Sequence, residues 1–167
     1  PPPHPVPTRR SSDLLETIVV EHPKSNLMPQ VRYEMAVAQQ NLGNPQVALQ
    51  LFDNVADAGQ GELAARARFM MGELHYANKD YSKAIREFRL VMFGFNKKAG
   101  PKVRTWQAKA GFEAGQCAGV LASQQADRAN RDRFVDLAKK FFDYVRTQHK
   151  DSDEAAAAIE QLKKYET

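Results

Sequence analysis

The side chains best suited to chemistry in this chain are four histidines and a single cysteine. No two of His4, His22, His75 and His149 stand at the spacing of metal ligands, so we expect no metal site. Cys117 would be a nucleophile only beside a base and a third, orienting group. We expect instead a buried structural thiol at Cys117 and a packed or half-buried imidazole at His75.

Glycine-rich motifs point the same way. The chain contains neither Gly-x-x-x-x-Gly-Lys nor Gly-x-Gly-x-x-Gly, whose backbone amides hold phosphates. It also lacks the Gly-x-Ser-x-Gly turn that presents a hydrolase serine. We therefore predict a protein without catalysis and without a cofactor.

One basic stretch has a composition suited to binding. Between Arg86 and Lys109 there are seven basic residues and one acidic residue, Glu87, with Phe93, Phe95 and Trp106 among them. Such a segment could bind an anionic groove, a nucleic-acid backbone or acidic headgroups. The simpler interpretation is a solvated link whose aromatic side chains pack on the helices, and we favour it. Its basic residues are Arg86, Arg89, Lys97, Lys98, Lys102, Arg104 and Lys109.

Composition limits the class of protein. Of 167 residues, 43% are hydrophobic and 26% are charged, as in globular proteins, and no apolar run is long enough for a transmembrane helix. The formal net charge is only +4, because 20 acidic residues offset 24 basic ones. Nucleic acid is therefore an unlikely partner, and the single cysteine leaves the redox compartment open.

The positioning elements are predicted to be helices. From Leu15 onward, apolar residues recur every three or four positions, and glycine and proline fall between blocks of about a dozen residues. Asn44 followed by Pro45 marks a helix start, as does Ser152, while Gly43 marks a helix end. The pattern predicts an all-α fold.

The helical blocks repeat. Residues 42–52 align with residues 78–88, so that Ala48 and Ala84, like Phe52 and Phe88, differ by 36 in number. A third copy has Ala138 and Phe142. In the preceding helices, Ala36, Gly72 and Gly115 occupy equivalent positions. Small residues let antiparallel helices approach, and we expect the phenylalanines to fill the grooves between successive helix pairs.

This arrangement resembles the tetratricopeptide repeat, a helix-turn-helix unit with small residues at the helix contact and an aromatic late in the second helix. The segment from Leu15 to Ser25, with its Pro-x-Ser link, is similar to bacterial cell-envelope members of that family. They are the lipoproteins of outer-membrane protein assembly and the Tol-Pal coordinator type. The resemblance implies an α-solenoid of stacked hairpins that binds proteins, in the periplasm or cell envelope, although a cytoplasmic location stays open.

The expected layout follows from these repeats. Residues 15–21 are the end of a helix, and repeats span about 27–58, 61–94 and 102–149, before a capping helix at 153–165. In the third repeat, Gly115 and Ala138 are 23 apart, against 12 for Gly72 and Ala84. The inserted residues 122–133 either lengthen both helices or form an exposed loop.

Residues 1–14 are expected to be a disordered tail. Five prolines fall among the first seven residues, and neither helical nor strand periodicity follows them. Residues 8–14 also resemble the translation of a sequencing adapter, which favours an artefact over a polyproline ligand. We expect the natural upstream sequence to be missing.

The leading functional hypothesis is a scaffold that binds a protein or peptide on a concave face lined by the first helix of each pair. Self-association is also possible. The alternatives are a binder of nucleic acid or envelope polysaccharide through residues 86–109, and a regulatory appendage of an enzyme encoded upstream. Candidate partner-binding residues are Tyr33, Gln40, Arg68, His75, Lys97, Lys98, Lys102, Trp106 and Lys109.

Overall fold

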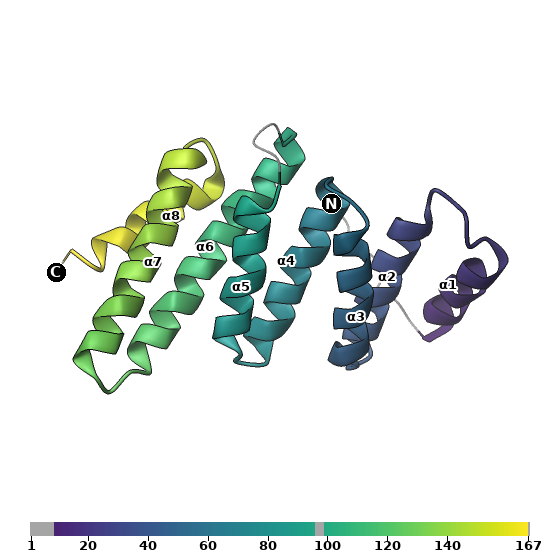
Figure 1. Cartoon of the computed structure of the whole chain (residues 1–167), viewed down its shortest axis with the longest axis horizontal. Coiled ribbons are helices and arrows are strands. Elements are labelled where there is room, and N and C mark those ends of the chain that lie inside the picture. Colours follow the sequence, from purple (N-terminus) through teal and green to yellow (C-terminus); the bar gives the residue numbers. More distant parts are fainter. Residues whose placement is uncertain (1–8, 96–98, 167) are drawn as a thin grey trace.

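A computed structural model describes residues 9–95 and 99–166, which form helices and no strand (Figure 1). The all-α prediction is thus confirmed for this part of the chain. The helices are α1 (Arg9–Glu21), α2 (Met28–Asn41), α3 (Pro45–Asp57), α4 (Glu62–Ala77), α5 (Tyr81–Phe93), α6 (Pro101–Ser123), α7 (Arg128–Gln148) and α8 (Asp153–Lys163).

Helix α1 begins earlier than the sequence pattern predicts. It starts at Arg9, so residues 9–14 are helical and do not belong to a disordered tail. The physical reason is that Pro7 is the last proline before Pro23, and no residue in between prevents the backbone from adopting helical dihedrals. The expectation for residues 1–8 lies outside the described part.

The same type of tight turn connects α2 to α3 and α4 to α5. Gly43 has a φ of +79° and Lys79 a φ of +60°, and both residues follow the end of a first helix. The amide of Asn44 donates to the Gln39 carbonyl at 2.9 Å, and that of Asp80 to the His75 carbonyl at 2.8 Å. These bonds satisfy carbonyls at the helix ends. The turn therefore repeats even where lysine replaces the favoured glycine.

The inserted residues lengthen both helices of the third pair. Helix α6 continues to Ser123 and α7 begins at Arg128, so only a short turn separates them. Asp127 caps α7 by accepting a bond of 2.8 Å from the Asn130 amide. By contrast, Asn44 and Ser152 stand at helix starts but make no capping side-chain bond.

The small residues and the rings fit together in the core. Ala48, Ala84 and Ala138 are buried, as are Phe52, Phe88 and Phe142. A Cβ atom added to Gly72 would lie 2.4 Å from the Phe88 ring, and one added to Gly115 would lie 2.5 Å from the Phe142 ring. Glycine at these positions therefore leaves the space that each ring occupies.

These contacts correct one expectation. Phe88 and Gly72 belong to the same helix pair, α4 and α5, and Phe142 and Gly115 both belong to the pair α6 and α7. Each ring thus fills the space between the two helices of its own pair. The prediction that these rings fill the groove between successive pairs was wrong. The physical reason is that each of these two glycines faces the second helix of its own pair, so the open space lies within the pair.

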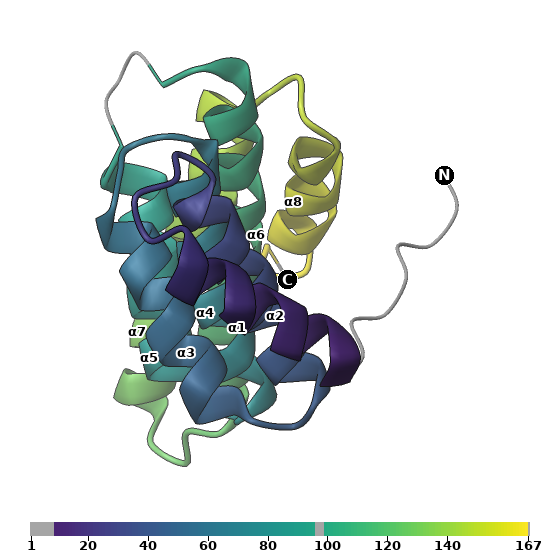
Figure 2. The same ribbon diagram turned by 90° about the vertical axis from the view of Figure 1, so that its right-hand side faces the viewer.

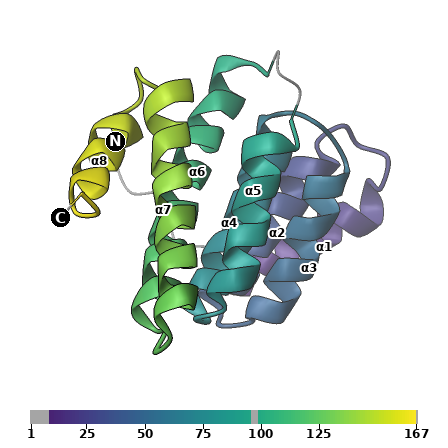
Figure 3. The same ribbon diagram turned by 60° about the vertical axis from the view of Figure 1, so that its left-hand side comes forward.

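The helices pack in chain order, from α1 at one end to α8 at the other (Figure 1). Consecutive helices are in contact, and α2 contacts α4, α4 contacts α6, and α6 contacts α8. Among the described residues, no Cα atom of α5 lies within 8 Å of one in α3 or α7. Figure 3 shows α5 and α7 in front of α4 and α6. The first helices therefore approach one another more closely than the second helices.

An ion-pair network around the buried Glu87 links three helices. Arg68 of α4 donates to Asp57 of α3 at 2.7 Å and to Glu87 of α5 at 3.1 Å. Arg86 also donates to Glu87, at 3.0 Å. The Glu87 side chain is only 2% exposed, so its charge depends on these two guanidinium groups.

Candidate functional site

A groove lies across helices α4, α6 and α8, and we call it the first-helix groove. Its volume is about 530 Å³. Figure 2 places α5 and α7 on one side of the molecule and α8 on the other, with α6 between them. The groove is thus on the side away from the second helices. Its lining consists of Phe69, Met70, Glu73, Trp106, Lys109, Phe112, Glu113, Asp153, Glu154 and Ala157.

Aromatic side chains form the apolar part of this groove and are anchored in the core. The Phe69 ring centroid lies 5.2 Å from that of Trp106 and 5.3 Å from that of Phe88. Phe112 lies 5.6 Å from Phe142 in the same way. Rings held between helices have few alternative rotamers, so the groove offers a preformed apolar surface.

Two cations lie against the aromatic end of the groove. The Lys109 Nζ atom is 4.9 Å from the Trp106 ring centroid. The Arg66 guanidinium lies 5.9 Å from the same ring and 4.6 Å from that of Tyr33. Cations at these distances are attracted by the electron-rich face of the ring. Both charges are therefore engaged by rings of the protein itself.

Two half-buried carboxyl groups, Glu73 of α4 and Glu113 of α6, lie farther along the groove. Burial raises the pKa of Glu113 to about 7, and the nearby Glu73 adds to this shift. Burial also raises the pKa of Glu73. Among the described residues, neither carboxyl has a hydrogen-bond or ion-pair partner. Their ionised forms are thus only partly solvated and are stabilised by no ion pair among the described residues.

The raised pKa of Glu113 predicts a pH-dependent effect of Glu113→Gln on the stability of the fold. The Glu113 pKa rises from 4.5 to about 7 on folding, so the folded protein holds an extra proton between these values. The contribution of Glu113 to the free energy of unfolding therefore falls as the pH rises through this range. Because water still screens the half-buried group, we expect the substitution to raise the free energy of unfolding by about 1–2 kcal/mol near pH 8.

Urea unfolding at about pH 5 and about pH 8 measures this difference, and the gain is expected to be much smaller at the lower pH. Asp136→Asn removes an exposed carboxylate of α7 and serves as the control. A gain for Glu113→Gln that is equal at both pH values would show that proton binding by Glu113 is not its cause.

Several residues expected from the sequence do not line the groove. Tyr33 is 1% exposed, with its ring centroid 5.3 Å from that of Phe52, so it fills the pair formed by α2 and α3. Arg68 belongs to the ion-pair network around Glu87. Tyr33 on α2 and Arg68 on α4 thus both face a neighbouring helix and not the groove.

Gln40 and His75 are half-buried and also lie outside the groove lining. The side-chain oxygen of Gln40 is buried without a hydrogen-bond partner. Burial lowers the pKa of His75, so the neutral imidazole is favoured, consistent with a packed histidine. Trp106 and Lys109 are the sequence-predicted residues that the structure brings together in the groove.

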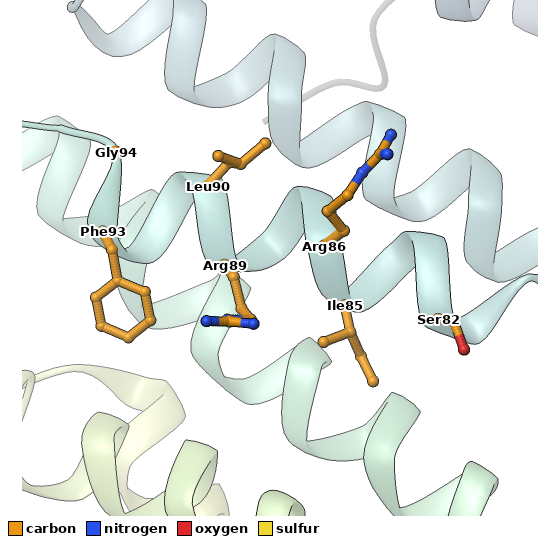
Figure 4. A pocket seen from close by; sticks show the side chains of 7 residues that line it. All are labelled: Ser82, Ile85, Arg86, Arg89, Leu90, Phe93 and Gly94. Atoms are coloured by element: carbon orange, nitrogen blue, oxygen red, sulfur yellow. The ribbon is translucent and has the colours of Figure 1, made fainter.

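The described basic residues between Arg86 and Lys109 have different surroundings. Arg86 and Arg89 line a depression of about 430 Å³ on α5, but their side chains extend to opposite sides of that helix (Figure 4). Lys102 forms an ion pair of 3.2 Å with Glu62. Arg104 lines a third cavity with Tyr144 and His149. Lys97 and Lys98 lie outside the described residues.

The thiol of Cys117 is fully buried, as expected from the sequence. Burial raises its pKa to about 12, with Glu113 and Glu73 adding to the shift, so the thiol is protonated at neutral pH. In the described ranges, no cluster of histidine, cysteine or acidic residues is arranged to hold a metal ion. No described helix is long and apolar enough to cross a membrane.

The acidic part of the groove was missed in the sequence, although a signal for it exists. Met70 and Glu73 follow Arg66 at helical spacing on one face of α4, and Lys109 and Glu113 follow Trp106 on one face of α6. Projecting the two first helices onto a wheel would have placed Glu73 and Glu113 beside the aromatics. The α8 residues carry no such signal, because their position depends on how α8 packs on α6.

Comparison with known proteins adds no constraint on this site. Searches against protein-family models, curated proteins and solved structures found no match to the chain.

Proposed function

We propose that this chain is a non-catalytic scaffold that binds a segment of another protein in the first-helix groove. The main support for this proposal is the groove itself, which has a volume of about 530 Å³. Its rings are anchored in the core, and its carboxyl groups form no ion pair among the described residues. Preformed apolar clefts with a few polar groups are the usual form of a binding site.

The helix packing supports a solenoid with the groove on its concave side. The first helices α4, α6 and α8 contact in sequence, while α5 contacts neither α3 nor α7 in the part of the chain that is described. A row of helix pairs that is closer on one side than on the other curves toward the closer side. Solenoids of stacked pairs use such concave surfaces for binding.

The same features support membership of the tetratricopeptide-repeat family as a proposal. The repeated fit of a late phenylalanine to a glycine of the preceding helix matches the small residues and late aromatic of that repeat, and the turn at Gly43 recurs at Lys79. The envelope location proposed for the chain depends on the sequence resemblance of residues 15–25 alone.

Binding of an anionic polymer is the second candidate function, because Arg86 and Arg89 lie beside the exposed side chains of Leu90 and Phe93. The side chains of Arg86 and Arg89 diverge in Figure 4, so they do not form one basic surface. We therefore favour a protein ligand in the first-helix groove over an anionic polymer on α5. It predicts an affinity that falls steeply with salt.

Selection of a random peptide library on the full chain tests the proposed function. Ala157 lines the groove, whereas Ala156 of the same helix is exposed and does not. We expect Ala157→Arg to fill the groove and abolish capture of the selected peptides, and Ala156→Arg to leave capture unchanged. Circular dichroism establishes that both variants are folded. Equal capture by the two variants would reject the groove as the binding site.

A further inference from the structure

The charges in the first-helix groove indicate the chemistry of its ligand. Resting on the function proposed above, we propose that the groove receives a lysine or arginine side chain of a partner protein, together with an adjacent apolar side chain of the same segment. The cation lies between Glu73 and Glu113, and the apolar side chain lies against Trp106.

The acidic end of the groove lacks the cation that its carboxyl groups require. Glu73 and Glu113 come from adjacent first helices and lie near each other, and Asp153 and Glu154 of α8 line another part of the same groove. In the described part of the chain, none of these four has an ion-pair partner. Neighbouring half-buried carboxylates repel each other unless a cation binds between them.

The cations nearest to these carboxyl groups lie over aromatic rings and form no ion pair with them among the described residues. Lys109 is the basic residue of the groove lining, and its Nζ atom lies over the Trp106 ring. Arg66 is likewise held between the rings of Tyr33 and Trp106. Charge complementarity therefore favours a basic ligand and disfavours an acidic one, which would meet four carboxyl groups.

The apolar end selects the second side chain of the ligand. Phe69, Trp106 and Phe112 are fixed by contacts with core rings, so a leucine or aromatic side chain can bury its surface there without reordering the groove. A groove of about 530 Å³ holds a few side chains at most. The fitting ligand is therefore a short segment with one basic and one apolar anchor.

Ligand binding is expected to depend on pH. A cation stabilises ionised Glu113, whose pKa lies near 7 in the free protein, so binding releases its proton. The other ionisable groups near Glu113 are Glu73 and Tyr76 from α4, Lys109 and the buried Cys117 thiol from α6, and Asp153 and Glu154 from α8. We expect affinity to increase between about pH 6 and about pH 8.

The test begins with the peptides that the full chain selects from the random library. We expect the tightest of them to contain arginine or lysine beside a leucine or aromatic residue. Its affinity is then measured for the wild-type chain and for Glu73→Gln/Glu113→Gln, with the basic residue present or replaced by glutamine. The double variant is expected to weaken the basic peptide about tenfold or more near pH 8 and the glutamine peptide hardly at all.

A matched control separates a local effect from one of net charge. Asp53→Asn/Asp136→Asn also removes two carboxylates, from α3 and α7, and neither residue lines the groove. We expect it to leave the affinity unchanged. An equal loss in this control would overturn the inference, because the attraction would then be long-range.

The failures of the inference and of the proposed function are distinguishable. Selected peptides that are acidic or uncharged, and whose affinity the Glu73→Gln/Glu113→Gln variant leaves unchanged, would overturn the inference. The proposed function would still stand if Ala157→Arg abolished their capture. Capture that survives Ala157→Arg would overturn both.

Discussion

Replacing Gly72 by alanine is expected to lower the free energy of unfolding by about 2–3 kcal/mol. The new Cβ atom would lie 2.4, 2.7 and 2.8 Å from three atoms of the Phe88 ring, which is fully buried. Alanine is the better helix former by about 1 kcal/mol, but this gain is smaller than the cost of displacing a packed ring. Chemical denaturation of the two proteins measures the difference.

A smaller side chain at position 88 provides the decisive comparison. We expect Gly72→Ala to cost less in a Phe88→Leu background, because leucine leaves room for the methyl group. Gly59→Ala is the control, since nothing lies within 4 Å of its added Cβ atom, and its effect is expected within about 0.5 kcal/mol. An equal cost of Gly72→Ala in both backgrounds would contradict the proposed fit of glycine and ring.

Replacing Arg68 by methionine is expected to destabilise the protein by about 3 kcal/mol. Glu87 would then stay buried with only Arg86, whose side chain is 69% exposed. Replacing Glu87 by methionine is expected to cost less, because Arg68 keeps Asp57 at 2.7 Å and Arg86 can turn to solvent. Thermal or urea unfolding of the two single variants measures this asymmetry.

The double variant Arg68→Met/Glu87→Met completes the cycle. It is expected to be more stable than Arg68→Met alone, because the uncompensated carboxylate is removed with its partner. Arg86→Met is the control for an exposed partner and is expected to cost at most about 1 kcal/mol. Additive losses for Arg68 and Glu87 would show that the two charges are not coupled.

The sequence predicts the helical frame well, because its signals are local. The spacing of apolar residues gives the helices, and Gly43 marks a turn whose φ of +79° few other residues tolerate. The equivalent turn at Lys79 is found only by alignment with Gly43. The start of α1 was missed because prolines and an adapter-like heptapeptide suggested a tail, although residues 9–14 contain no helix breaker.

The site is less predictable, because it depends on which face of each first helix stays open. An aromatic such as Tyr33 looks like a ligand contact in the sequence and is instead 1% exposed in the structure. Trp106 lies only three residues from Lys109, so the sequence shows their common face. The contribution of Asp153 and Glu154 could not be predicted, since it requires the packing of α8 on α6.

The central claim is that the first-helix groove holds the partner, and amide chemical-shift mapping of the full chain with a selected peptide tests it most directly. We predict that the largest shift changes centre on Phe69 to Glu73, Trp106 to Glu113, and Asp153 to Ala157, the segments that contain the groove-lining residues. Changes confined to the α5 depression between Ser82 and Gly94 would contradict the claim.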